Sequence, residues 1–173
     1  MDFTALLESL QYSDLAQWVN TGGATYPVVE SLHVLAVAMV FGTILIVDLR
    51  LLGVASTNRP FTRVAHDLLH LTWIGFALAV TSGILLFLPN ATSIAINVSF
   101  QVKMALLVLA GLNMFVFEFV TARDVKSWDT TQPPPNSARI AGLLSILLWA
   151  AIVVFGRMIG FTPAAGADPF AAL

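Results

Sequence analysis

The chain contains no cysteine and very little charge. Without cysteine it cannot form disulfides, thiolate metal sites or the covalent attachment of a c-type haem. Only 10% of the 173 residues are charged, whereas 58% are hydrophobic, and the mean hydropathy is +0.86. This composition excludes an ordinary soluble domain and gives no basic surface for nucleic acid. It predicts an integral membrane protein in contact with the lipid bilayer.

Four apolar stretches are long enough to cross a bilayer. They cover approximately residues 31–54, 64–88, 99–121 and 138–161. At about 1.5 Å per residue, each exceeds the roughly 30 Å of hydrocarbon. The expected fold is all-α: an antiparallel bundle of four transmembrane helices within residues 24–162, with no separate soluble domain.

The segments on either side of this bundle differ from it in composition. In residues 1–23, apolar side chains recur at helical spacing among polar ones, which predicts an amphipathic helix at the membrane interface. Residues 163–173 are rich in Ala and Gly and form a C-terminal tail, either frayed or docked on a neighbouring subunit. Trp128, between the third and fourth spans, is expected to be an interfacial anchor.

The basic residues predict the orientation. Most of the eight Lys and Arg residues flank the connections between the first and second spans and between the third and fourth: Arg50, Arg59, Arg63, Arg123, Lys126 and Arg139. An excess of Lys and Arg in short loops marks the cytoplasmic face. Both termini are therefore expected on the non-cytoplasmic side of a multi-pass membrane protein.

Three histidines, His33, His66 and His70, lie in or at the edge of the spans. An ionisable residue inside a span marks a functional site, and histidine is the commonest ligand of metals and haem. The first two spans form a hairpin that turns near residues 57–58, so Ser82 should lie level with His33. His70 is about twelve residues from that level, an offset of roughly 18 Å. Since two ligands of one iron need nearly the same height, we expect two separate sites.

The first site contains His33 and residues of the third and fourth spans. The same hairpin reasoning brings Lys103 and Met104 to the level of His33, and Arg157 lies near the same face. Histidine and methionine form a known axial pair for haem, and Lys or Arg can neutralise a propionate. These residues predict a site for b-type haem. Alternatively, His33 only hydrogen-bonds between helices, Met104 fills the core, and the two cations extend to the interface.

The second site contains His66 and His70, one helical turn apart, with Asp67 beside them. With Glu118 at a similar depth they could hold zinc, copper or iron, or His70 could bind a second haem. Alternatively, His66 belongs to the polar interfacial belt, and His70 pairs with Glu118 or Asp48.

Two stretches resemble a known superfamily. The segment His33-Val-Leu-Ala-Val-Ala-Met-Val-Phe41-Gly42, followed by Asp48-Leu-Arg50, resembles the first span of a group of bacterial four-helix membrane proteins. That group includes the membrane-bound, haem-containing protoporphyrinogen oxidase and the copper-resistance protein D domain. The stretch Lys103-Met-Ala-Leu-Leu-Val-Leu-Ala-Gly-Leu-Asn113 is similar to its third span, which a lysine opens.

The resemblance implies roles for two residues. His33 would be a haem axial ligand, and Lys103 would occupy the functional or haem-edge position. Asn113 stands where the superfamily often has a histidine, and His66 and His70 are not part of its pattern. The implied location is the bacterial inner (cytoplasmic) membrane.

Together these observations predict an integral membrane protein with one or two b-type haems. Its expected role is electron transfer, either to or from quinone or as the cytochrome subunit of a larger oxidoreductase. Whether the chain is itself an enzyme stays open. Three alternatives also stay open: a porphyrinogen-oxidising enzyme, a protein that handles copper or another metal, and a structural subunit without a cofactor. Other membrane subunits or further copies of the chain are possible partners.

Overall fold

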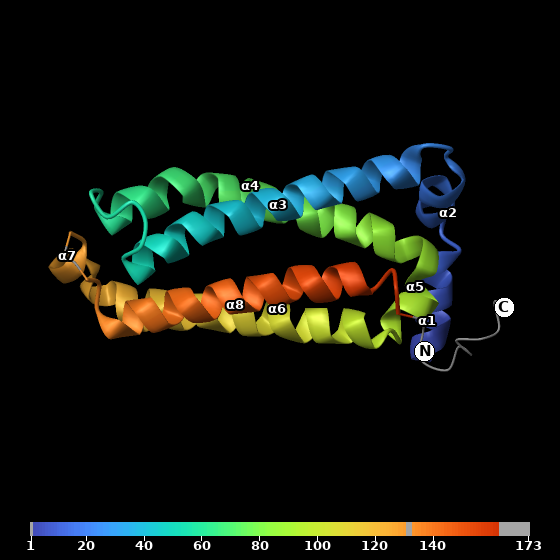
Figure 1. Cartoon of the computed structure of the whole chain (residues 1–173). Coiled ribbons are helices and arrows are strands. Elements are labelled where there is room, and N and C mark those ends of the chain that lie inside the picture. Colours follow the sequence, from blue (N-terminus) through green and yellow to red (C-terminus); the bar gives the residue numbers. More distant parts are fainter. Residues whose placement is uncertain (1, 131–132, 163–173) are drawn as a thin grey trace.

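The computed structural model describes residues 2–130 and 133–162. Its main elements are four long helices, α3 (Thr25–Leu52), α4 (Phe61–Phe87), α6 (Val98–Val116) and α8 (Asn136–Met158). They run antiparallel, side by side (Figure 1). Each lies in a segment long and apolar enough to cross a membrane. The predicted all-α membrane bundle is confirmed.

Shorter elements lie at the two ends of the bundle (Figure 1). One end carries α1 (Phe3–Gln11), α2 (Asp14–Thr21), η1 (Leu88–Asn90) and α5 (Ala91–Ala95). The other carries a wide π-helical turn, η2 (Phe117–Thr121), followed by η3 (Ala122–Asp124) and α7 (Val125–Trp128). We call these the His33 end and the Arg50 end, after the residues of α3 that lie toward each.

The N-terminal segment differs in detail from its prediction. Two helices, not one, precede α3, because Ser13 caps the second by accepting a hydrogen bond from the backbone N–H of Ala16 at 3.3 Å. They lie across the His33 end, where the Gln11 side chain accepts hydrogen bonds from the backbone and hydroxyl of Thr92. Helix α3 begins at Thr25 rather than near residue 31, since Pro27 lies in its first turn, where a missing N–H breaks no helical hydrogen bond.

The four long helices form two pairs. Helix α3 packs along α4, and α6 packs along α8, whereas α3 and α8 join one pair to the other. The pairs form the upper and lower layers of Figure 1. Helices α4 and α6 have little backbone contact. Aromatic rings nevertheless meet near both ends of the interface between them. Phe87 stacks on Phe100 at 5.5 Å, and Phe61 meets Phe117 edge-on at 5.8 Å.

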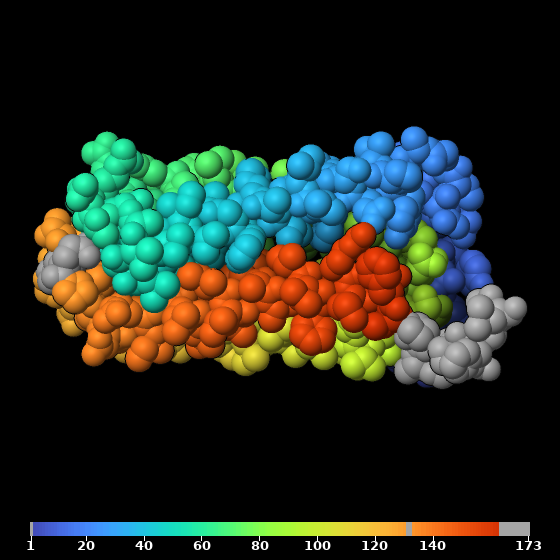
Figure 2. Space-filling model, viewed as in Figure 1, coloured from blue at the N-terminus to red at the C-terminus, as the bar shows by residue number. Residues whose placement is uncertain are grey.

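The two pairs approach each other closely at Gly142 of α8. A Cβ atom at this position would lie 3.0 Å from the Cβ of Leu51 and 3.1 Å from the backbone oxygen of Asp48. The Asp48 carboxyl, buried on α3, also interacts with the Ser145 hydroxyl on α8. Toward the His33 end, α3 and α8 diverge, and Figure 2 shows a crevice between them. The bundle is therefore tight at the Arg50 end and more open at the His33 end.

An apolar cluster closes the Arg50 end. It contains Leu51 of α3, Phe61 of α4, Trp128 of α7 and Ala138 of α8. The rings of Phe61 and Trp128 lie 5.4 Å apart. The expectation that Trp128 anchors at the interface is wrong, because its side chain is only 7% exposed and packs within this cluster.

The close contact at Gly142 gives a test of this packing. In a helix, Gly to Ala normally gains up to about 1 kcal/mol. We expect Gly142→Ala instead to lower the free energy of unfolding by about 1–3 kcal/mol, because the new methyl group meets the α3 backbone. The control is Gly111→Ala on α6, where no atom lies within 4 Å of the new Cβ. Equal effects of the two variants on unfolding in detergent would contradict this packing.

Candidate functional site

His33 lies half-buried on α3, with its ring directed at α4. Its Nδ1 atom is 3.0 Å from the hydroxyl oxygen of Ser82, which is itself only 2% exposed. The backbone carbonyl of Ala79 also interacts with the ring. Ser82 is the residue that the hairpin geometry placed level with His33. Two polar groups of α4 therefore hold the imidazole within the bundle.

The hydrogen bonds around Ser82 indicate the tautomer of His33. The single hydroxyl hydrogen of Ser82 is donated to the backbone carbonyl of Leu78 on its own helix. The Ser82 oxygen is then left to accept a hydrogen bond from His33 Nδ1–H. A neutral imidazole carries one N–H, so Nε2 keeps its lone pair. A histidine whose Nδ1–H is held in this way can bind a metal through Nε2.

Glycine leaves room for the ring on α4. A Cβ atom at Gly83 would lie only 3.1 Å from Cε1 of His33. Even an alanine at this position would therefore crowd the imidazole. The local sequence Ser82-Gly83 supplies both the hydrogen-bond acceptor and the space that this ring position requires.

Lys103 brings a cation from α6 to the same site. Its ammonium group interacts electrostatically with the His33 ring. Its Cδ, Cε and Nζ atoms are each 3.6 Å from the place that a Cβ at Gly156 of α8 would occupy. The site thus combines residues of all four long helices, and it lies at the end where α3 and α8 diverge.

The other two residues of the predicted haem site lie at the surface. Met104 of α6 is 45% exposed. Arg157 of α8 is also exposed, and its guanidinium stacks over the ring of Phe161, 5.2 Å from the ring centroid. The structure therefore brings His33 and Lys103 together, and it leaves Met104 and Arg157 outside their contact.

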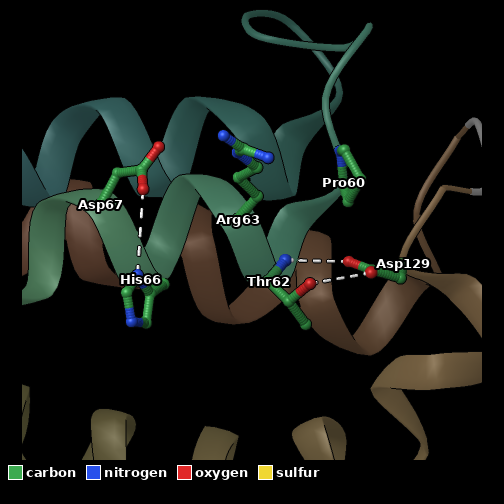
Figure 3. Close-up of a pocket in the computed structure, with 6 residues that line it drawn as sticks. All are labelled: Pro60, Thr62, Arg63, His66, Asp67 and Asp129. Carbon is green, nitrogen blue, oxygen red and sulfur yellow. Dashed lines mark hydrogen bonds and ion pairs between the residues drawn. The ribbon is translucent and has the colours of Figure 1, made fainter.

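The second predicted site has a more open geometry. The His66 side chain is 88% exposed and lies 3.8 Å from the Asp67 carboxylate, while His70 is exposed one turn further along α4. His66 and Asp67 line an open depression, and Figure 3 shows their side chains. Its lining residues are Pro60, Thr62, Arg63, His66, Asp67 and Asp129. Within residues 2–130 and 133–162, no group of three or more His, Asp or Glu side chains could hold a metal ion.

Sequence reasoning missed the buried role of Arg50. Its side chain is fully buried and donates hydrogen bonds to the backbone carbonyls of Arg59 and Asp129, both at 3.0 Å. The Asp129 carboxylate in turn accepts hydrogen bonds from the backbone and hydroxyl of Thr62, both at 2.8 Å (Figure 3). Arg50 therefore ties both loops of this end together. The sequence signal was an arginine in the last turns of the first apolar span, but its partners are backbone atoms.

These features define an all-α, multi-pass membrane protein with a polar site between its helices. The family model described as "Family of unknown function (DUF6644)" matches residues 7–162. The chain belongs to this family. No curated protein and no solved structure matches it.

The bond between His33 and Ser82 gives a second test. We expect Ser82→Ala to lower the free energy of unfolding by about 0.6 kcal/mol, the average for hydrogen bonds between membrane helices, and by no more than about 1.7 kcal/mol. The neighbouring Thr81→Ala is the matched control, because the Thr81 hydroxyl is exposed and bonds only to the Ala77 carbonyl of its own helix. Unfolding in mixed detergent would measure both. A loss for Thr81→Ala as large as that for Ser82→Ala would argue against the interhelical bond.

Proposed function

We propose that this chain is an integral membrane protein that binds a b-type haem through Nε2 of His33. The observation that carries the proposal is the hydrogen bond from His33 Nδ1 to Ser82, since in this tautomer Nε2 keeps the lone pair that iron would need. The imidazole lies on a span, between helices, in a chain that has no cysteine to act as a ligand. The resemblance of the His33 and Lys103 segments to a haem-containing superfamily supports the same function.

The residues of the site fit one side of a haem. His33 supplies a neutral imidazole, Ser82 orients it, and the crevice between α3 and α8 lies at the same end of the bundle (Figure 2). His33, and not Met104, would hold the haem iron, since the Met104 side chain is 45% exposed. A second haem at His70 has no comparable support, because that ring is exposed on α4.

The proposed role is electron transfer, to or from quinone or as the cytochrome subunit of a larger oxidoreductase. When bound, a b-type haem supplies an iron centre that takes up and releases one electron. The residues of the chain bind and orient it. Ser82 fixes the direction of the imidazole and increases its basicity, and the apolar helices keep water away. A lipid-soluble quinone would reach this site through the bilayer.

The distribution of charge supports an orientation in the bacterial inner membrane. Exposed basic side chains gather at the Arg50 end: Arg59, Arg63, Arg123, Lys126 and Arg139. By the positive-inside rule this end faces the cytoplasm. The haem site and α1 would then lie toward the opposite side of the membrane.

A structural subunit without a cofactor is the second candidate. The same bond between His33 and Ser82 favours it, because a histidine can serve only to join two membrane helices. The two candidates differ in whether Nε2 of His33 binds iron. Among the described residues, no three His, Asp or Glu side chains gather in a way that could hold a copper ion.

The visible spectrum of the purified protein separates these candidates. Protein from cells supplied with a haem precursor should show a b-type spectrum, oxidised and dithionite-reduced, with about one haem per chain by pyridine haemochrome. His33→Ala should lose the haem because the assigned iron ligand is gone. His70→Ala is the control and should keep it, since that ring is exposed on α4.

Two results would contradict the proposal. A colourless wild-type protein would leave the structural subunit as the better account. Full haem content with an unchanged spectrum in a folded His33→Ala protein would show that another residue is the ligand. Size-exclusion chromatography of each variant in detergent checks that it is folded.

A further inference from the structure

The outward face of α4 carries two histidines inside a membrane span. His66 and His70 are exposed and lie one helical turn apart, on the side of α4 opposite the buried Gly75 and Ser82. His70 lies roughly 14 Å beyond the start of α4, well inside the apolar span. An ionisable side chain at such a depth is costly in lipid and normally faces protein. The outward face of α4 is therefore expected to be covered by another protein surface.

The outward faces of α6 and α8 have a different character. In the middle of these helices the exposed side chains are apolar, as contact with lipid requires. Four of them are more than half exposed: Val108, Leu112, Leu147 and Val154. On α4, His70 is followed on the same face by Trp73, which is 52% exposed, and then by the small Ala77. A large aromatic side chain beside a small one suits packing against a further helix.

The two imidazoles are arranged as metal ligands. In residues 2–130 and 133–162, His70 forms no hydrogen bond or ion pair. The Nδ1 atom of His66 lies 3.8 Å from Oδ1 of Asp67, and Figure 3 shows the ring extending away from the helix. A carboxylate beside one ring nitrogen orients a histidine to bind metal through the other. Histidines four residues apart on one helix face can hold the same zinc ion.

We infer that His66 and His70 form half of a zinc site, which a second copy of this chain completes across the outward faces of α4. Copies of a membrane protein share one orientation. A twofold axis along the membrane normal therefore brings the same residues of two α4 helices to the same height.

Four imidazoles, two from each copy, make the complete tetrahedral set of a closed zinc site. Within the described part of one chain, no third His, Asp or Glu side chain completes the pair. The site is thus incomplete without the second copy. The open depression beside His66 gives the ion access from water. The inference does not depend on a haem at His33.

The absence of cysteine allows the interface to be tested by cross-linking. Ala77→Cys places a single thiol on the outward face of α4, two turns beyond His70. In native membranes, molecular iodine should join two such thiols as a disulfide, so that most of the chain migrates as a covalent dimer. Leu147→Cys is the matched control, because this side chain is 59% exposed on the outward face of α8. It should stay largely monomeric. Equal cross-linking at both positions would reflect random collision and overturn the inference.

Zinc binding tests the shared site itself. Protein purified in detergent is stripped with a chelator, equilibrated with zinc chloride, and assayed for zinc content and for mass. We expect about one zinc ion per two chains. At a zinc concentration about ten times its dissociation constant, the dimer should dissociate about tenfold less than the stripped protein, because only the dimer holds the ion fully. His66→Ala and His70→Ala should each lose this effect. His33→Ala is the control and should keep it.

Each remaining outcome contradicts the inference in a distinct way. One zinc ion per monomeric chain would show that a single copy suffices. Absence of zinc binding, or a dimer that responds neither to zinc nor to His70→Ala, would show that these histidines are not shared ligands. The visible spectrum of the same samples keeps the two proposals separate. A colourless protein that binds zinc in the expected ratio would contradict the haem proposal alone.

Discussion

The hydrogen bond between His33 and Ser82 fixes the geometry on which the site depends. In hydrocarbon a polar side chain finds its partner within the protein, so such a bond sets how two helices are rotated and shifted against each other. A second bond, between the hydroxyls of Thr43 and Thr72 at 2.9 Å, joins α3 to α4 further along the same interface. Two bonds at two heights define the register of the hairpin. The first of them also holds Nδ1 of His33 against α4.

The arrangement of the helix pairs explains why the site lies at one end. At the Arg50 end, Gly142 allows α8 to approach the backbone of α3, and Arg50 joins the loops through the carbonyls of Arg59 and Asp129. This end is packed and cross-linked by hydrogen bonds. At the other end α3 and α8 diverge, and there His33 and Lys103 lie between the pairs. The fold thus combines a closely packed Arg50 end with a His33 end at which α3 and α8 diverge.

Much of this fold could be predicted from the sequence, because membrane helices have a fixed length and rise. Four apolar runs gave four spans, and counting residues from the hairpin turn placed Ser82 opposite His33, as the structure confirms. The same counting placed Lys103 near His33. It could not decide between Lys103 and Met104, since neighbouring residues point about 100° apart on a helix and the span limits are uncertain by several residues.

Contacts between distant loops could not be predicted in this way. Arg50 bonds to backbone carbonyls, which carry no residue signature, and Trp128 packs on Phe61 across a chain reversal. The contact of Lys103 with Gly156 depends on which face of α8 meets α6, and hydrophobic periodicity is weak in a helix that is apolar on most sides. These contacts are set by how the helices and loops pack in three dimensions, which spacing along the chain does not specify.

The most direct test of the account is chemical rescue of the axial ligand. His33→Gly removes the imidazole and leaves its space, so free imidazole should restore the b-type spectrum of the haem-loaded variant, while the same addition to His70→Gly changes nothing. A His33→Gly protein that keeps the wild-type spectrum without imidazole would contradict the assignment of His33 as the iron ligand.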